Sequence, residues 1–220
     1  MIDHNTCIRE LLAGLKSMAK RNDVIRDTHG NLSVMNRCSG MVYIKPSGMP
    51  YEDIEAHDVC GICISDGLQE TGLPRKPSVD TVHHLEIYRR APHIRAICHT
   101  HSPYATVFAI GTRGIPILCT EQADYFGGPI RCVPYHDLDT WGAHAVPKEG
   151  EKALLLGNHG ALTFGSTPKE AVNLAIALEN VAQKTYLALM LHDRSGFVYK
   201  LPADEVRKWH ERYNNVYGQK

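Results

Sequence analysis

The segment from Thr167 to about His192 constrains the fold of this chain more than any other. Its first residues, Thr167-Pro-Lys-Glu170, supply an N-cap threonine, a proline at the first helical position and a glutamate that can cap in return. This pattern predicts a helix that continues to about His192. Because the segment is apolar on most of its helical surface, we expect the helix to be buried against other elements.

Short apolar runs, separated by polar turns, fill much of the chain before this helix. Runs of roughly four to eight apolar residues are typical of buried strands, whereas longer stretches with helical periodicity indicate helices. We predict strands at residues 32–35, 41–44, 59–64, 94–101, 130–133 and 153–156, and further helices at 4–20, 79–90, 102–110 and 204–214. Ser78 is the predicted N-cap of the helix at 79–90. The pattern predicts a single α/β domain over residues 1–220, with helices flanking a central sheet.

The composition argues against several classes of partner. Twenty-four lysines and arginines balance 24 aspartates and glutamates, so the chain lacks the basic surplus typical of proteins that bind nucleic acids or membrane surfaces. No apolar run approaches the roughly 18 residues that a membrane-spanning helix needs. The seven cysteines are odd in number and scattered, without a signal peptide before them. We therefore expect a soluble cytoplasmic protein with no nucleic-acid or membrane partner.

His99-Thr-His101 is the sharpest chemical feature of the sequence. It ends a predicted strand, on which side chains two residues apart point to the same face. Two imidazoles so placed can share one metal ion, and a catalytic zinc site has three protein ligands and an open position. Asn158-His-Gly160 offers the best third ligand, because it follows a predicted strand and its glycines suit a tight turn. From the residues alone, rivals for the third ligand remain: His136, His144, His192 and His210.

Three loops combine small polar residues, glycine and lysine: Gly30-Asn-Leu-Ser33, Lys45-Pro-Ser-Gly48 and Lys76-Pro-Ser-Val-Asp80. Phosphate binding needs positive charge and several hydrogen-bond donors, which glycine turns, helix N-termini and serine hydroxyls supply. Ser78 is well placed for this because we expect it to begin a helix. Taken singly, each loop is better explained by ordinary turn chemistry.

Taken together, these segments resemble the class II aldolase and adducin family. The resemblance runs in order through Gly30-Asn-Leu-Ser33, Lys45-Pro-Ser-Gly48, Pro77-Ser-Val-Asp80, His99-Thr-His-Ser102, Asn158-His-Gly160 and Tyr217-Gly-Gln219. Any one motif is weak, whereas the ordered set is specific. It implies a three-layer α/β fold with a mostly antiparallel sheet, and a fourfold-symmetric homotetramer whose active sites lie between subunits.

The resemblance also implies roles for individual residues. The family's three zinc ligands fall on His99, His101 and His159, which selects His159 among its rivals; the implied cofactor is Zn²⁺ or another divalent ion such as Mn²⁺ or Co²⁺. The implied substrate is a small phosphorylated sugar, and the family's phosphate contacts fall on Asn31, Lys45, Ser47, Gly48 and Ser78. The implied acid–base groups are Asp80, Asp124 and Tyr217, the last two donated by a neighbouring subunit.

Two enzyme types of the family stand close to this sequence, L-ribulose-5-phosphate 4-epimerase and L-fuculose-1-phosphate aldolase. Asp80 occupies the position of an aldolase glutamate, Thr120 that of an aldolase tyrosine, and Asp124 lies in the epimerase-like stretch Ala123-Asp-Tyr-Phe126. Val79 departs from the epimerase pattern, which has a second phosphate-binding serine there. We therefore expect the epimerase, with L-fuculose-1-phosphate aldolase or a related ketose-1-phosphate aldolase as the alternative. A dehydratase or decarboxylase of the family is a third possibility, and the retained histidines argue against a non-catalytic adducin-like module.

Both enzyme types make or break a carbon–carbon bond next to a carbonyl. Cleavage leaves an enediolate, which a zinc ion chelated by its two oxygens would stabilise as a Lewis acid. Phosphate contacts would hold the reacting bond in place. In the epimerase reaction the bond between C3 and C4 breaks, and the aldehyde fragment rotates and recombines through its other face.

Overall fold

A mixed sheet forms the middle of the molecule. The computed structural model describes residues 3–25, 27–70, 74–135, 140–195 and 199–218. The strands within them are β1 (Asn31–Asn36), β2 (Met41–Ile44), β3 (Cys60–Cys63), β4 (Ala96–Thr100), β5 (Cys132–Val133), β6 (Ala153–Leu156) and β7 (Gly160–Gly165). They are ordered β3-β2-β1-β4-β7-β6-β5, and the neighbouring pairs are antiparallel except for β5 and β6. The expected α/β fold with a mostly antiparallel sheet is confirmed.

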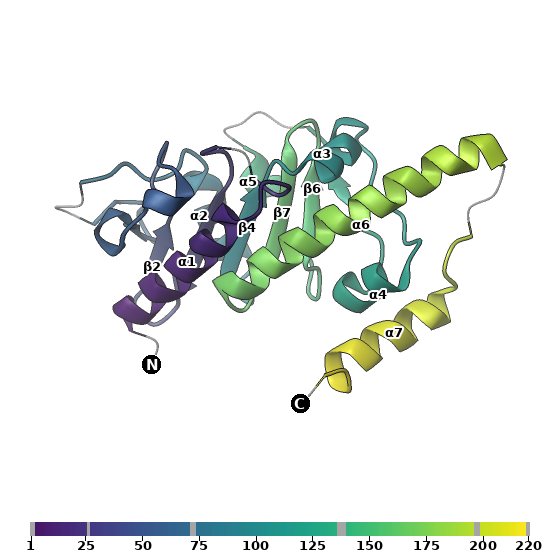
Figure 1. Cartoon of the computed structure of the whole chain (residues 1–220). Coiled ribbons are helices and arrows are strands. Elements are labelled where there is room, and N and C mark those ends of the chain that lie inside the picture. Colours follow the sequence, from purple (N-terminus) through teal and green to yellow (C-terminus); the bar gives the residue numbers. More distant parts are fainter. Residues whose placement is uncertain (1–2, 26, 71–73, 136–139, 196–198, 219–220) are drawn as a thin grey trace.

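Helices cover both faces of this sheet. They are α1 (His4–Ala19), α2 (Thr81–Arg90), α3 (Pro103–Ile110), α4 (Thr120–Phe126), α5 (Trp141–His144), α6 (Pro168–Ser195) and α7 (Ala203–Asn215), with two short 3-10 helices, η1 (Tyr51–Asp53) and η2 (Ala56–Asp58). Figure 1 shows α1 and α6 lying across one face of the sheet, and α7 beside α4, away from the sheet. None of the described helices is both long and apolar enough to cross a membrane.

Strand β4 lies at the centre of the sheet and separates two apolar cores. Ala96 and Cys98 pack into the core that α1 and α6 share. Ile97, between them in sequence, packs on the opposite face with residues of α2 and α5. Because side chains alternate along a strand, His99 emerges on the face of Ile97, whereas Cys98 is a core residue of the opposite face. The pairing of β1 with β4 places Asn31 opposite His99.

Most predicted elements match the structure within a few residues, but one predicted cap is wrong. Helix α2 begins at Thr81, with Asp80 at the N-cap position. Ser78 lies in the turn before it: its carbonyl oxygen accepts the backbone N–H of Thr81 at 3.1 Å, and its hydroxyl accepts from the side-chain amide of Asn31 at 3.0 Å. Ser78 therefore joins two loops instead of capping the helix. The sequence interpretation also omitted β7, α4 and α5.

Helix α6 begins as its capping signal predicts. The backbone N–H of Glu170 donates to the hydroxyl of Thr167 at 3.1 Å, while the carboxylate of Glu170 accepts from the backbone N–H of Ser166 at 2.8 Å. Most residues of its first half are buried, but Leu187 and Leu191 are 49% and 66% exposed. Full burial of this helix was a wrong expectation for its last turns, because they extend past the sheet (Figure 1).

Candidate metal centre and its cavity

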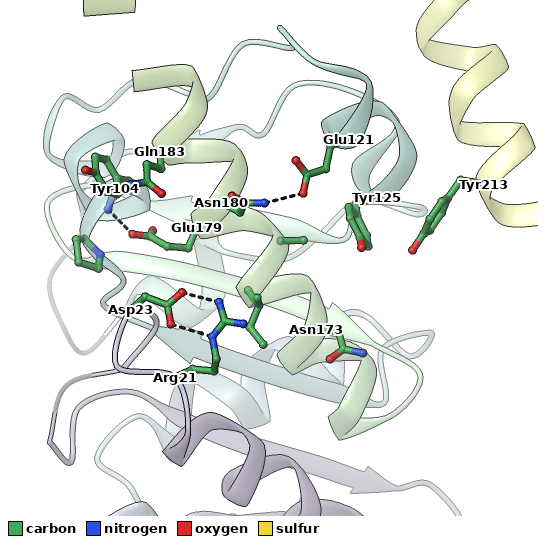
Figure 2. Close-up of a pocket in the computed structure, with 13 residues that line it drawn as sticks. Arg21, Asp23, Tyr104, Glu121, Tyr125, Asn173, Glu179, Asn180, Gln183 and Tyr213 are labelled. Carbon is green, nitrogen blue, oxygen red and sulfur yellow. Dashed lines mark hydrogen bonds and ion pairs between the residues drawn. The ribbon is translucent and has the colours of Figure 1, made fainter. Parts of the chain in front are cut away.

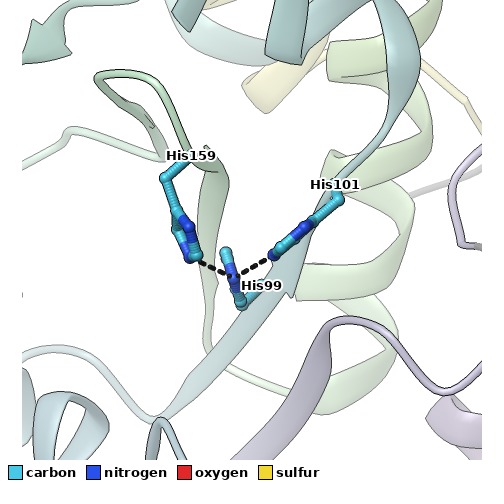
Figure 3. Close-up of side chains that lie close together, drawn as sticks. All are labelled: His99, His101 and His159. Atoms are coloured by element: carbon cyan, nitrogen blue, oxygen red, sulfur yellow. Dashed lines mark hydrogen bonds between the residues drawn. The ribbon is translucent and has the colours of Figure 1, made fainter. Parts of the chain in front are cut away.

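Three histidines converge at the end of β4. His99 is fully buried, whereas His101 and His159 are partly exposed. The Nε2 atom of His99 lies 2.9 Å from that of His101 and 3.1 Å from that of His159. Figure 3 shows the rings of His101 and His159 pointing toward His99 from two sides. The structure therefore brings together the three residues that the sequence motifs selected.

The turn between β6 and β7 places the third histidine. Asn158 adopts a left-handed backbone conformation with φ of 58°, and the backbone N–H of His159 donates to the carbonyl of Leu156 at 3.0 Å. A Cβ added at Gly160 would stand 2.5 Å from the carbonyl oxygen of Thr100, so only glycine permits this approach. The predicted tight turn is present, and it carries His159 to the end of β4, where His99 and His101 lie.

The rival ligands do not join this cluster within the part of the chain that is described. His210 lies on α7, where its Nδ1 atom is 2.9 Å from the carbonyl oxygen of Ala123. His144 lies on α5. His136 and the side chain of His192 lie outside the described residues.

The nitrogen atoms of the cluster suit a divalent metal ion. The Nδ1 atom of His99 lies 3.0 Å from the carbonyl oxygen of Ala161, which can only accept, so Nδ1 carries the proton and Nε2 keeps its lone pair. Three nitrogens on a tetrahedral zinc ion at about 2.0–2.1 Å would lie about 3.3 Å apart, close to the spacing here. Without a cation between them, lone pairs that converge so closely would repel one another.

Burial keeps these imidazoles neutral. Burial, followed by the neighbouring His159 and His29, lowers the pKa of His101 to about 4. Burial, followed by the charges of His101 and His159, also lowers the pKa of His99 well below its ordinary value. Because metal ligation requires neutral imidazole, the site is ready to bind a cation at neutral pH.

Asp80 lies beside the three histidines. Its Oδ2 atom is 3.9 Å from Nε2 of His99 and accepts a hydrogen bond of 2.7 Å from the side-chain amide of Asn31. Burial lowers the pKa of His159, and the negative charge of Asp80 opposes that shift. The carboxylate is therefore positioned next to the centre and held by a residue of β1.

A cavity of about 500 Å³ opens onto the histidines. His101, His159 and Asp80 line one part of it. The five predicted phosphate contacts also line this cavity: Asn31, Lys45, Ser47, Gly48 and Ser78. The exposed side chain of Val79 lies among them. Two of the three candidate metal ligands, His101 and His159, thus line the same cavity as the polar loops.

Backbone hydrogen bonds join the two lysine-containing loops to each other. The backbone N–H of Ser47 donates to the carbonyl of Lys76 at 2.9 Å, and that of Ser78 donates to the carbonyl of Lys45 at 3.0 Å. Pro46 and Pro77 form an antiparallel bridge between them. Ser47 and Ser78 are therefore held on neighbouring segments, although 31 positions separate them in the sequence.

Lys45 brings positive charge to the cavity in a buried position. It is 1% exposed, and its Nζ atom lies 4.7 Å from the ring centre of Tyr51 and donates to the carbonyl of Pro46 at 3.2 Å. Burial lowers the pKa of Lys45 to about 8. The ammonium group is poorly solvated, so an anion in the cavity would stabilise it.

The sequence interpretation missed several residues at this site. His29 lines the cavity, and its ring lies 5.6 Å from that of His101. His83 also lines it and stacks at 4.1 Å on Trp141, whose ring lies 5.8 Å from that of His99. His29 stands directly before the Gly30-Asn-Leu-Ser33 motif, and that position was the one available signal. No pattern singled out Trp141.

Asp124 and Tyr217 lie outside the histidine cavity, on α4 and just after α7, two helices that pack against each other. Neither lines the cavity of the histidines. Helices α4 and α7 pack against each other, and a row of rings links them: Tyr125 lies 5.1 Å from Tyr213, which stacks at 5.3 Å on Tyr217. Burial raises the pKa of Asp124. Gln219, the last residue of the tail motif, lies outside the described residues.

A second cavity, of about 650 Å³, lies along α6 (Figure 2). Its lining includes Arg21, Tyr104, Glu121, Tyr125, Glu179 and Tyr213. Arg21 is paired with Asp23, and Asn180 donates to Glu121 at 2.8 Å. The charged groups of this hollow are thus largely engaged with one another, in contrast to the histidine cavity.

This fold, with three histidines beside a phosphate-suited cavity, defines a class II aldolase-like sugar-phosphate enzyme. Residues 9–186 match the family described as Class II Aldolase and Adducin N-terminal domain, and the chain belongs to that family. The family expected from the ordered motifs is thereby confirmed.

Solved structures agree with this assignment. An L-fuculose 1-phosphate aldolase is 29% identical, with a TM-score of 0.84 over 97% of this chain and 98% of that chain. YgbL from Klebsiella pneumoniae, named as an aldolase, epimerase or decarboxylase, is 26% identical, with a TM-score of 0.77 over 93% and 98% of the two chains. The L-fuculose 1-phosphate aldolase from Glaciozyma antarctica PI12 is 22% identical and shares the fold, with a TM-score of 0.77 over 94% and 80%. Two of these three structures carry the name of the alternative enzyme type, L-fuculose 1-phosphate aldolase.

Proposed function

We propose that this protein is a divalent-metal-dependent aldolase that reversibly cleaves a carbon–carbon bond of a phosphorylated ketose, of the L-fuculose 1-phosphate type. The observation that carries the proposal is the shared cavity: His101 and His159 line the same hollow as Ser47 and Ser78. The likeness to an L-fuculose 1-phosphate aldolase over 97% of the chain supports the substrate class.

The polar loops would bind the phosphate group of the substrate. Ser47 offers its hydroxyl and Gly48 its backbone N–H, and Ser78 offers a second hydroxyl on the adjacent segment. Lys45 supplies the positive charge, and the amide of Asn31 links this region to Asp80. Binding the phosphate at one end would place the ketose carbonyl near the histidines without further loss of entropy in the reacting step.

At the histidines, a divalent ion such as Zn²⁺, Mn²⁺ or Co²⁺ would act as a Lewis acid on the carbonyl and hydroxyl oxygens of the ketone fragment. Asp80 is the carboxylate beside the centre, 3.9 Å from His99. In the direction of condensation, Asp80 would take a proton from the hydroxymethyl carbon of the ketone fragment, and Tyr217 would give a proton to the aldehyde oxygen as the new bond forms. Cleavage is the reverse of these two transfers.

The positions of Asp124 and Tyr217 support a shared active site. The two belong to one pair of helices but lie outside the cavity of their own chain's histidines. We therefore place them in the active site of a neighbouring subunit, within a homotetramer whose sites lie at subunit contacts. This arrangement would give each site a metal centre from one chain and a proton donor from the next.

A second candidate function is 4-epimerisation of L-ribulose 5-phosphate. Asp124 favours it, because burial raises the pKa of this carboxyl group toward the range useful for proton transfer. Asp80 and Thr120 also favour the epimerase, because they occupy positions where the aldolase has a glutamate and a tyrosine. The same bond cleavage would then be followed by rotation of the bound aldehyde and recombination.

Parallel assays separate the two functions. With L-fuculose 1-phosphate, the aldolase releases dihydroxyacetone phosphate and lactaldehyde, which a coupled dehydrogenase assay detects. With L-ribulose 5-phosphate, the epimerase produces D-xylulose 5-phosphate without net cleavage. Efficient epimerisation without cleavage of the 1-phosphate would replace the aldolase proposal. A protein without metal and without either activity would instead indicate an adducin-like module.

A further inference from the structure

Glu179 is a buried carboxylate far in sequence from the histidines. It lies on α6, is 5% exposed, and accepts hydrogen bonds from the backbone N–H groups of Tyr104 at 2.8 Å and Ala105 at 2.9 Å. Figure 2 shows its side chain reaching toward the start of α3. The hydroxyl of Ser102 also donates to it, which opposes the rise in the pKa of Glu179 that burial causes. One carboxylate thus joins α6 to the first turn of α3.

The first turn of α3 has few other partners. Ser102 occupies the N-cap position, but its side chain makes no capping hydrogen bond, and Pro103 at the next position has no N–H. The free donors of this turn are therefore those of Tyr104 and Ala105, and Glu179 takes both. A carboxylate at this end also interacts favourably with the helix dipole.

Helix α3 connects two of the three candidate ligands. Its start directly follows His101, with only Ser102 between them. At its other end, the carbonyl of Ala109 accepts a hydrogen bond of 3.0 Å from the backbone N–H of Asn158, the residue before His159. A shift of α3 along α6 would therefore move both ligand-bearing turns relative to the fixed strand position of His99.

We propose that Glu179 is a positioning residue of the metal centre, which sets the spacing of His101 and His159 by fixing α3 to α6. Its effect on metal binding depends only on the three histidines. Its effect on catalysis rests on the proposed aldolase function. Packed helices and buried hydrogen bonds hold this spacing. Loss of the carboxylate should therefore weaken metal binding without weakening the binding of the substrate phosphate at the polar loops.

Glu179→Gln and Glu179→Ala test this role, with Glu170→Gln as the matched control. Glu170 is also an α6 carboxylate that accepts a backbone N–H, that of Ser166 at 2.8 Å, but it lies at the opposite end of β7 from His159. The affinity for Co²⁺ is measured by its visible absorption and by competition with a chelator. We expect Glu179→Ala to weaken binding about tenfold or more, Glu179→Gln to fall between it and wild type, and Glu170→Gln to bind as wild type does.

Two further readouts separate positioning from plain stability. Thermal unfolding of the metal-free proteins gives the stability loss of each variant. With excess metal, Glu179→Gln should regain turnover while the KM for the phosphorylated substrate stays at the wild-type value. If Glu179→Ala does not fold, Glu179→Gln carries the test, because it preserves the volume of the side chain.

Glu179 variants that lose thermal stability but bind Co²⁺ within twofold of wild type would overturn the proposal. The affinity measurement uses the metal alone. If the wild-type protein cleaves no sugar phosphate, the proposed function is contradicted. The Co²⁺ affinities of the variants still decide the role of Glu179.

Discussion

Gly160 lies against Thr100 so closely that a Cβ at Gly160 would stand 2.5 Å from the carbonyl oxygen of Thr100. The same added carbon would meet the rings of His99 and His101 at 3.2 Å and 3.3 Å. Gly160, which follows His159, thus allows the β6–β7 turn to approach His99 and His101. This contact joins the packing of the sheet directly to the geometry of the candidate metal centre.

Gly160→Ala should therefore damage the site more than the fold. Relief of the contact with Thr100 requires the turn to move, at a cost of about 1–3 kcal/mol for an overpacked position, and the movement carries His159 away from His99. We expect weaker Co²⁺ binding together with a lower unfolding temperature. Gly128→Ala is the control, because its added carbon meets nothing within 4 Å. Wild-type Co²⁺ affinity in Gly160→Ala would show that the turn is not held by this approach.

Lys45 predicts a dependence of substrate binding on pH. Burial lowers the pKa of Lys45 to about 8, so the side chain is charged below that pH and becomes neutral above it. Since only the charged form attracts phosphate, kcat/KM for a phosphorylated ketose should fall as the pH rises through about 8. A hydrogen bond to a charged group contributes about 1.5–3 kcal/mol, so Lys45→Met should lower kcat/KM about tenfold or more below pH 8.

Lys45→Arg is the matched control for this prediction. Arginine stays charged throughout the accessible pH range, so any activity it keeps should lack the fall above pH 8. An unchanged fall in Lys45→Arg would assign the pH dependence to another group.

His29 should contact the substrate, not the metal. Its ring lies 5.6 Å from that of His101, and it lines the cavity. Loss of one hydrogen bond to a substrate hydroxyl costs about 1 kcal/mol, so His29→Ala should lower kcat/KM about fivefold. The exposed His57 on η2 provides the control variant, His57→Ala. Co²⁺ affinity that drops in His29→Ala would indicate that His29 supports the ligands instead.

The inter-subunit site can be tested by mixing two inactive proteins. His99→Ala removes the metal centre, and Tyr217→Phe removes the proposed proton donor. In a randomly mixed ring of equal parts, about a quarter of the subunit contacts combine an intact centre with an intact tyrosine. Co-expressed subunits should therefore show about a quarter of the wild-type activity. Activity no higher than the sum of the two separate variants would place Tyr217 in its own chain's site or outside the mechanism.

Periodicity and capping predicted most of the elements, and the reasons for the failures are physical. The apolar runs at 41–44 and 153–156 are buried strands, as predicted, because four residues suffice for a strand but are too few for most helices. Helices α4 and α5 have seven and four residues, too few for a helical period to show. Strand β7 begins and ends with glycine, a residue typical of turns, so the sequence alone did not indicate a strand there.

The candidate site was predictable in its residues more than in its arrangement. Spacing alone supported His99 and His101, and the ordered motifs added His159. The pairing of the loop of Ser47 with that of Ser78 depends on backbone hydrogen bonds that no local pattern encodes. Trp141 was not predictable because its segment carries no chemical motif, whereas His29 had one signal, its position directly before the Gly30-Asn-Leu-Ser33 motif.

If the three histidines hold a metal ion, the cleavage of a phosphorylated ketose should depend on that ion and on His99. The most direct measurement is release of dihydroxyacetone phosphate from L-fuculose 1-phosphate by purified protein, with the metal content determined on the same sample, for wild type and His99→Ala. We expect about one divalent ion per chain and metal-dependent cleavage in the wild type, with both lost in His99→Ala. Cleavage that persists at the wild-type rate in metal-free His99→Ala would contradict a catalytic metal centre at these histidines.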